Sequence, residues 1–301
     1  MSFTSRVRSH AVPVVLAAAA ALGLTACDPP PDSYVALGDS FTAGPAIMPQ
    51  DAAFPGCFSS TVNYPHLIAP FLAPPAFRDV SCSGAQTKDM TAPQDVKPDP
   101  DNPAQLEALD ASTRIVTLGI GGNDIGFTEI ATQCGESFLL QPKGSPCRDF
   151  YNSGGVDQIG GRIAQLAPKL DDVLDRIDAK SPRAKVFVVG YPAILPETTE
   201  NFVACQATLP VAEGDVAFLR DEVEKRLNAT IQYVAVSHGE AYVDTYTPSI
   251  GRDACEPPTV RWVEPVAPGA DAFPVHPNRD GMEASARAVK SAMRAHGVTV
   301  R

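Results

Sequence analysis

The sequence predicts an α/β domain of three layers, in which helices cover both faces of a central parallel sheet. Short apolar runs alternate along the chain with longer stretches of helical periodicity, an order typical of βα units. The run Val186-Phe187-Val188-Val189 is apolar at every position, as expected of a strand buried on both faces. No internal repeat interrupts the pattern, and residues 27–301 are enough for one large domain with a full core.

Five strands and four helices follow from this alternation. The strands are expected at the apolar runs Ser33–Leu37, Arg78–Cys82, Arg114–Ile120, Lys185–Tyr191 and Ala241–Thr245. The helices are expected over Asn63–Phe71, Gly160–Ala179, Gly214–Ser237 and Asn278–His296. In the last of them, Met282, Val289 and Met293 form an apolar face. Because ligands bind such sheets at the carboxyl ends of the strands, the residues that follow each strand are the first candidates for a functional site.

Residues 1–32 are predicted to direct export and to lie outside the folded domain. Arg6 and Arg8 precede the apolar run Ala11–Leu24, which is too short to span a bilayer and is typical of a signal peptide. The run ends in Leu24-Thr25-Ala26-Cys27, which resembles a bacterial lipobox, so we expect residues 1–26 to be removed and Cys27 to be lipidated. An ordinary signal peptide with an incidental cysteine is the alternative. The prolines in residues 27–32 make a short tether, and residues 33–301 form the domain.

The cysteine count agrees with export. The chain has seven cysteines, and six remain once Cys27 is assigned to the lipid: Cys57, Cys82, Cys134, Cys147, Cys205 and Cys255. An even number in an exported protein indicates three disulfides, for which fifteen pairings are possible. We favour sequential pairing, Cys57–Cys82, Cys134–Cys147 and Cys205–Cys255. Metal binding is not expected, because the chain has no Cys-x-x-Cys pair.

The net charge of −11 restricts the partners of the chain. Basic residues do not cluster, so nucleic acid is not an expected partner. The acidic balance also opposes electrostatic binding to an anionic bilayer, so the lipid on Cys27 would provide any membrane contact. We expect the protein to be a monomer.

The motif Gly38-Asp39-Ser40-Phe41 places a serine at the junction between the first predicted strand and a helix. At such a junction the hydroxyl can be exposed at the sheet edge, and the backbone N–H can face developing negative charge. Ser40 is therefore a candidate nucleophile, with a helix cap as the alternative interpretation. We interpret Asp39 as a structural hydrogen-bonding residue, because adjacent residues rarely act as nucleophile and triad acid.

Two glycine-containing loops provide candidate donors for an oxyanion. In Cys82-Ser83-Gly84-Ala85, the glycine allows the backbone to approach a substrate closely. The motif Gly121-Gly122-Asn123-Asp124 follows a strand, and its two glycines permit a sharp turn that aims the Asn123 amide into the site. An amide donates to an oxyanion without competing for the serine proton. A simple turn residue is the alternative for Asn123, and Asp124 is expected to brace the loop.

Elimination among the five histidines indicates the general base. His10 lies in the predicted signal, His66 lies inside a predicted helix, and His238 and His296 each precede a glycine near a helix end. His276 lies in a loop, before a proline and the last helix, where it can take a proton from the serine. A surface histidine is the alternative.

Together the motifs resemble those of the SGNH (GDSL-type) hydrolase superfamily, over nearly the whole of residues 33–301. The serine, glycine, asparagine and histidine blocks of that family are similar to the motifs at Ser40, Gly84, Asn123 and His276. Three further segments resemble secreted actinobacterial esterases and lipases with three disulfides: Asn63-Tyr64-Pro65, Val80–Ala85 and Arg261–Pro265. The resemblance implies a flavodoxin-like α/β/α fold and a serine ester hydrolase without metal or organic cofactor.

One position departs from the family pattern. Many members have an aspartate three residues before the histidine, where this chain has Phe273. Some relatives use a main-chain carbonyl at this place, which leaves a Ser–His dyad. We therefore predict that the Phe273 carbonyl orients the His276 ring, with the Asp271 carboxylate as the alternative partner.

The expected reaction is acyl transfer to Ser40, followed by hydrolysis of the acyl-enzyme. His276 takes the serine proton, while the N–H groups of Ser40 and Gly84 and the Asn123 amide stabilise the oxyanion. Apolar residues near the motifs suit the acyl chain of a lipid-like ester: Phe41, Ile47, Met48, Phe54, Ile125, Phe127, Trp262 and Phe273. The alternatives are a carbohydrate acetyl esterase and a non-catalytic lipoprotein that binds acyl or glycan ligands.

Overall fold

The computed structural model of the chain describes residues 2, 32–200, 202–267 and 271–301. The predicted signal peptide and Cys27 lie outside the described residues, as does the predicted tether apart from Asp32. Residues 31–301 form one structural unit by their contacts. No helix in the described part of the chain is long and apolar enough to cross a membrane.

The centre of this unit is a parallel sheet of five strands, as predicted, in the order β2-β1-β3-β4-β5. The strands are β1 Ser33–Gly38, β2 Ala76–Asp79, β3 Thr113–Gly119, β4 Lys185–Val189 and β5 Ala241–Val243. In the register of the two central strands, Gly38 pairs with Gly119, so β1 and β3 end side by side. β2 begins and ends earlier than predicted, although the N–H groups of Val80 and Cys82 still donate to β1 carbonyls beyond its end.

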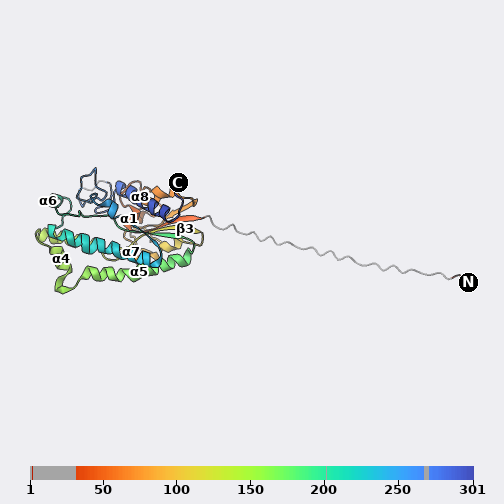
Figure 1. The fold of residues 1–301 in the computed structure, drawn as a ribbon, viewed down its shortest axis with the longest axis horizontal. Helices are drawn as coiled ribbons and strands as arrows, with labels where there is room; N and C mark the ends of the chain where they lie inside the picture. The colour runs from red at the N-terminus through yellow and green to blue at the C-terminus, as the bar shows by residue number, and fades with distance from the viewer. Residues whose placement is uncertain (1, 3–31, 201, 268–270) are drawn as a thin grey trace. The chain divides into compact units, whose positions relative to one another are not determined.

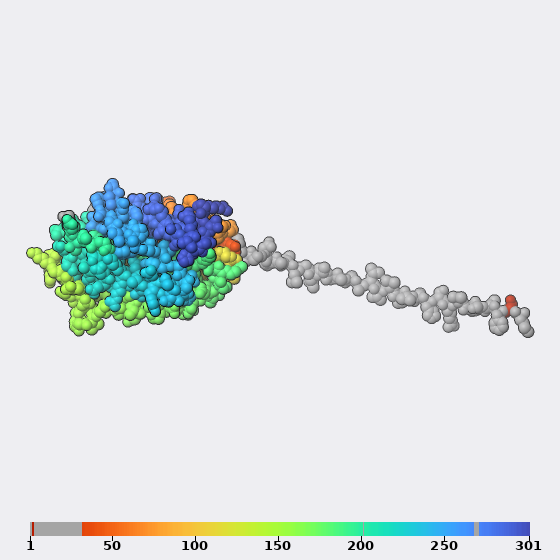
Figure 2. All heavy atoms as spheres, viewed as in Figure 1, coloured from red at the N-terminus to blue at the C-terminus, as the bar shows by residue number. Residues whose placement is uncertain are grey.

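Helices cover both faces of the sheet, which confirms the three-layer prediction (Figure 1). α5 Gln158–Lys180 and α7 Arg226–His238 lie on one face, and α8 Arg279–Ala295 lies on the other together with the short α2 Tyr64–Ile68. Side chains that alternate along each strand enter opposite cores, so that Val35 packs toward α5 and α7 while Ala36 packs toward α8. On the side seen in Figure 2, the second half of the chain, green to blue, forms most of the surface.

Side-chain caps mark the starts of the two long helices that were predicted correctly. Asp157 accepts the Gly160 N–H at the start of α5, and Asn278 accepts the Gly281 N–H at the start of α8. The helix predicted over Gly214–Ser237 is instead divided into a 3₁₀ turn, Glu213–Asp215, a π-helix, Phe218–Lys225, and then α7. The short α1 Ser40–Ala43 is the helix expected at the serine junction. Three other α-helices were not predicted: α3 Phe127–Leu140, α4 Pro146–Tyr151 and α6 Phe202–Cys205.

The three disulfides form with the sequential pairing that the sequence analysis favoured. Cys57–Cys82 joins the loop before α2 to the loop after β2, which contains Gly84. Cys134–Cys147 links α3 to α4, and Cys205–Cys255 links α6 to the loop after β5. The first and third pairs therefore hold loops at the carboxyl edge of the sheet, where the candidate site lies.

Candidate active site

A glycine turn at the end of β1 positions Ser40 at the carboxyl edge of the sheet. Gly38 has a φ of 155°, and a Cβ there would lie 2.3 Å from Thr42 Oγ1 and 2.7 Å from the Gly119 carbonyl oxygen. The buried Gln105 side chain pairs with both backbone groups of Gly38, accepting its N–H at 2.8 Å and donating to its carbonyl at 2.9 Å. Only glycine therefore fits at position 38, and Ser40 begins α1 directly after the turn.

Asp39 connects the serine turn to the glycine loop after β3. One oxygen of its buried carboxyl accepts the Phe41 N–H at 2.9 Å, and the other accepts the Tyr191 hydroxyl at 2.6 Å. The Tyr191 oxygen in turn accepts the Gly122 N–H at 2.7 Å. Burial raises the pKa of Asp39 to about 7. These contacts agree with the structural role predicted for Asp39, and Tyr191 is a member of the network that the sequence analysis missed.

His276 meets Ser40 across 236 residues of chain. Its Nε2 lies 2.7 Å from Ser40 Oγ, and the histidine is 7% exposed. Its Nδ1 lies 2.8 Å from the Pro274 carbonyl oxygen, which accepts a hydrogen bond from an Nδ1–H. That bond leaves the lone pair on Nε2, where it faces the serine hydroxyl. The predicted nucleophile and base are thus in hydrogen-bond contact.

The predicted partner of the imidazole is wrong. The Phe273 carbonyl accepts the main-chain N–H of His276 at 3.1 Å and closes a β-turn, in which Val275 has a φ of 63°. The next carbonyl, that of Pro274, is therefore the one that reaches the ring. The alternative, Asp271, is exposed and forms no hydrogen bond with the ring, whose Nδ1 already binds Pro274.

The segment Arg261–Pro265 holds the histidine loop in place. The Glu264 N–H donates to the His276 carbonyl, and the Val275 N–H donates to the Glu264 carbonyl, both at 2.9 Å. A buried ion pair joins Arg261 to Glu264 within this segment. The sequence analysis used this segment for its resemblance alone, and the contacts supply the physical reason for it.

The three predicted oxyanion donors line one cleft of about 620 Å³ together with His276. Gly84 has a φ of 81°, which favours glycine at that position. The Asn123 amide donates one hydrogen to the Ala85 carbonyl at 3.0 Å, and its second N–H remains for a ligand. Asp124 accepts the N–H and hydroxyl of Thr87, so it braces the loop as predicted.

Comparison with known proteins decides the family. Residues 36–284 match the sequence model of the GDSL-like Lipase/Acylhydrolase family, a range that includes all four motifs. The chain belongs to this family. It is 42% identical over 250 residues to Lipase 2 of Streptomyces coelicolor, covering 82% of this chain and 81% of that protein.

Solved structures give the same assignment for this lipase/acylhydrolase. The phospholipase A1 of Streptomyces albidoflavus NA297 is similar with a TM-score of 0.71 and 27% identity, over 88% of this chain and 99% of that one. The extracellular lipase of Streptomyces rimosus is similar with a TM-score of 0.63 and 27% identity, over 87% and 99%. The protein is a carboxylic ester hydrolase with the SGNH fold. The alternative of a non-catalytic binding lipoprotein is therefore wrong.

In this hydrolase, burial controls the basicity of His276. Removal from water lowers the pKa of the imidazole to about 4, and the hydrogen bond to Pro274 opposes part of that shift. A carboxylate partner would raise the pKa further, but Pro274 supplies a neutral carbonyl. The ring is therefore neutral at pH values where an ordinary histidine is charged.

This shift predicts hydrolysis at acid pH. A histidine accepts a proton only when it is neutral, so activity that requires neutral His276 is present above its pKa and is lost as the pH falls through it. We expect kcat/KM for a neutral ester to stay level as the pH falls through 6.5, and to be halved near pH 4. Initial rates between pH 3 and 9 measure this, with circular dichroism at each pH to exclude unfolding. A half-maximal pH near 6.5 in folded enzyme would contradict the expectation.

The apolar residues expected to suit an acyl chain are divided between several places. Phe273 lines the cleft, whereas Phe41, Ile125 and Phe127 line a second cavity. Of the others, Ile47 is a core residue, Met48 and Phe54 are exposed, and Trp262 lies in the segment that holds the histidine loop. The predicted contact with the acyl chain of a lipid-like ester is therefore limited to the residues that line the cleft and the cavity.

One group of side chains with the spacing of metal ligands occurs among the described residues, and it lies away from the hydrolase site. The ligand atoms of Asp178, His238 and Glu240 are within 4.8 Å of one another. They lie near the C-terminal ends of α5 and α7, before β4 and β5, and so at the opposite edge of the sheet from Ser40. That the reaction needs no cofactor stays a prediction.

Proposed function

We propose that the protein is exported and hydrolyses lipid-like carboxylic esters through an acyl-enzyme on Ser40, with His276 as the base. The observation that carries this proposal is the 2.7 Å contact between Ser40 Oγ and His276 Nε2, beside three donors in one cleft. A nucleophile, its base and an oxyanion site are the groups that acyl transfer needs. The Nδ1 contact with Pro274 keeps the ring in the tautomer that accepts the serine proton.

The reaction proceeds in two halves. Ser40 Oγ attacks the ester carbonyl as its proton passes to His276 Nε2, and the oxyanion accepts hydrogen bonds from the Ser40 and Gly84 N–H groups and from Asn123 Nδ2. His276 then gives the proton to the leaving alcohol, and Ser40 carries the acyl group. In the second half, water attacks the acyl-enzyme with His276 as base and restores the serine hydroxyl. The protein itself supplies every proton-transfer group.

Several observations favour a lipid-like ester delivered outside the cytoplasm. Proteins similar to this chain are named lipase, phospholipase A1 and extracellular lipase. Export through residues 1–26 and a lipid on Cys27, followed by a tether of a few residues, would hold the monomeric enzyme close to a membrane. Mass spectrometry tests the anchor, because a diacylglycerol on Cys27 adds its mass to the processed N-terminus.

Hydrolysis of a graded series of esters tests the substrate class. We expect kcat/KM for 4-nitrophenyl esters to rise from acetate toward octanoate and decanoate, because each added methylene that is buried contributes about 0.8 kcal/mol. The measurement uses the purified protein, with the Ser40→Ala variant as a blank for each ester. Turnover confined to acetate would replace the lipid-like ester with the acetyl esterase alternative.

A further inference from the structure

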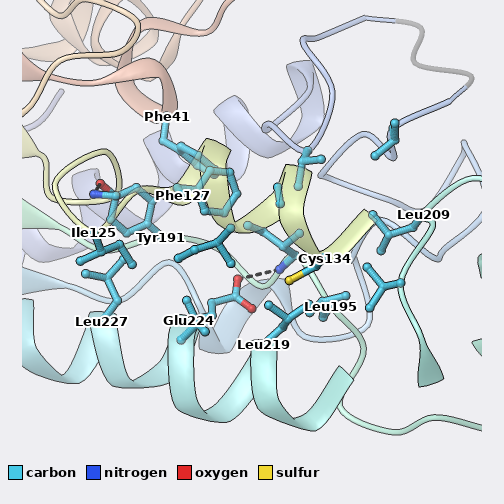
Figure 3. Close-up of a pocket in the computed structure, with 18 of the residues that line it drawn as sticks. Phe41, Ile125, Phe127, Cys134, Tyr191, Leu195, Leu209, Leu219, Glu224 and Leu227 are labelled. Carbon is cyan, nitrogen blue, oxygen red and sulfur yellow. Dashed lines mark hydrogen bonds between the residues drawn. The ribbon is translucent and has the colours of Figure 1, made fainter. Parts of the chain in front are cut away.

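Beside the candidate active site is a partly open cavity of about 100 Å³, whose lining includes the exposed Val266. Its lining side chains are apolar apart from Glu224 and the hydroxyl of Tyr191, which already binds Asp39 and Gly122 (Figure 3). Phe41 and Phe127 line the cavity and also contact the catalytic base, with ring centroids 4.7 Å and 6.5 Å from that of His276. Two aromatic rings thus lie between the cavity and the histidine, and an acyl chain that enters the cavity from Ser40 has to displace one of them.

Glu224 brings a carboxyl group into this apolar space. It lies on the π-helix Phe218–Lys225, a type of helix that often occurs at functional sites, and it is 8% exposed. In Figure 3 its side chain extends from its helix toward α3. Its Oε1 accepts the Ile194 N–H at 2.8 Å, whereas its Oε2 has no hydrogen-bond partner among the described residues.

The state of this carboxyl determines what it can bind. Burial raises the pKa of Glu224 well above that of an ordinary carboxyl, which favours its protonated form. A protonated carboxyl has an O–H to donate as well as its acceptor oxygens. Because Oε1 already accepts the Ile194 N–H, Oε2 is the buried oxygen left without a partner among the described residues, and in the protonated form it can donate an O–H.

A buried polar atom without a hydrogen-bond partner destabilises the folded protein. Such an atom in the lining of a cavity therefore indicates a ligand that would supply the missing hydrogen bond. The desolvation cost of such an atom is about 1–3 kcal/mol. Ligand sites are mostly apolar, with a small number of placed polar groups that select the ligand. Cavities of about 150 Å³ bind a benzene molecule, so this one has room for several carbons of a chain.

We propose that the cavity receives the distal part of the acyl chain, and that Glu224 Oε2 hydrogen-bonds an oxygen on that chain. The preferred acyl group would then carry a hydroxyl or ether oxygen several carbons from the ester carbonyl. This inference rests on the proposed function, since the acyl chain must be attached to an ester that Ser40 attacks. The alternative is that Oε2 binds a water molecule and has no contact with the substrate.

The test compares esters that differ in one oxygen. The substrates are 4-nitrophenyl hexanoate, octanoate and decanoate, each beside its ω-hydroxy and ω-methoxy counterparts. The enzymes are the wild type, Glu224→Leu, Glu224→Gln and the matched control Glu222→Leu, which changes an exposed glutamate of the same π-helix. Glu224→Gln keeps an acceptor for Ile194 and a donor for the ligand, and Glu224→Leu removes both.

At one chain length, we expect the wild type to prefer the oxygenated ester by about tenfold in kcat/KM, which corresponds to about 1.4 kcal/mol. The preference should persist in Glu224→Gln and Glu222→Leu and should disappear in Glu224→Leu. Plain esters preferred at every length by the wild type would overturn the proposal even if Glu224→Leu failed to fold. An unchanged preference in folded Glu224→Leu would also overturn it. Loss of Ser40-dependent hydrolysis of every ester would instead contradict the proposed function itself.

Discussion

Replacing Ser40 with alanine is expected to lower kcat for ester hydrolysis by about 10⁶-fold, the effect of removing the nucleophile from a serine hydrolase. Alanine has no oxygen to form the acyl-enzyme, and water in the cleft would have to attack the ester directly. The oxyanion donors and the cleft remain, so a small residual rate over water is expected. The measurement is the steady-state rate on the preferred 4-nitrophenyl ester, with release of the first product followed for a burst.

Two controls make the result specific. The side chain of Ser40 bonds with His276 alone among the described residues, so its loss should leave the thermal midpoint nearly unchanged. Ser83 lines the same cleft, and Ser83→Ala should keep most of the activity because its hydroxyl is not in contact with His276. Near-normal turnover by folded Ser40→Ala would contradict the acyl-enzyme mechanism.

Replacing His276 with alanine is expected to lower kcat by about 10⁴-fold, the upper end of what a positioned general base contributes. The serine hydroxyl would keep its proton, because in the described residues its side chain has no other hydrogen-bond partner. KM should change less, because the cleft and the oxyanion donors do not depend on the imidazole. Added imidazole should restore part of the rate if the space it leaves is accessible.

The matched control for this variant is His296→Ala, which removes an exposed histidine near the C-terminus of α8. That variant should keep full activity. The Phe41 ring packs 4.7 Å from His276, so the fold of the His276→Ala variant needs its own check by circular dichroism. A loss of less than tenfold in a folded variant would remove His276 from the role of base and would require another group in the cleft.

How far the fold can be read from the sequence depends on the length and clarity of each apolar pattern. β1 and β4 were found because buried parallel strands are nearly continuous apolar runs, whereas the half-buried β2 has a weaker pattern and was placed two residues too late. α3 and α4 were missed because few of their side chains are buried, and because a disulfide between Cys134 and Cys147 joins them. The π-helix before α7 was also missed, since its wider turn depends on what it packs against.

For the candidate site, too, some features could be predicted from the sequence and others depend on the tertiary structure. By itself, the sequence predicted the candidate groups of the site, because Ser40, Gly84, Asn123 and His276 each lie in a short motif with a local physical reason for its residue types. Tertiary structure alone decided the partners of these groups. The carbonyl that reaches the His276 ring is that of Pro274, because the Phe273 carbonyl is used to close the turn.

Contacts between distant parts of the chain were equally hidden from the sequence. The hydrogen bonds from Tyr191 to Asp39 and from Gly122 to Tyr191 join three loops at the ends of three strands, and no local pattern encodes them. The same holds for Glu224, which looks like one more charged residue on a polar helix until the fold buries it in an apolar cavity. Local sequence determines which groups are available, whereas hydrogen bonding and burial depend on distances that exist only after the sheet has brought the strand ends together.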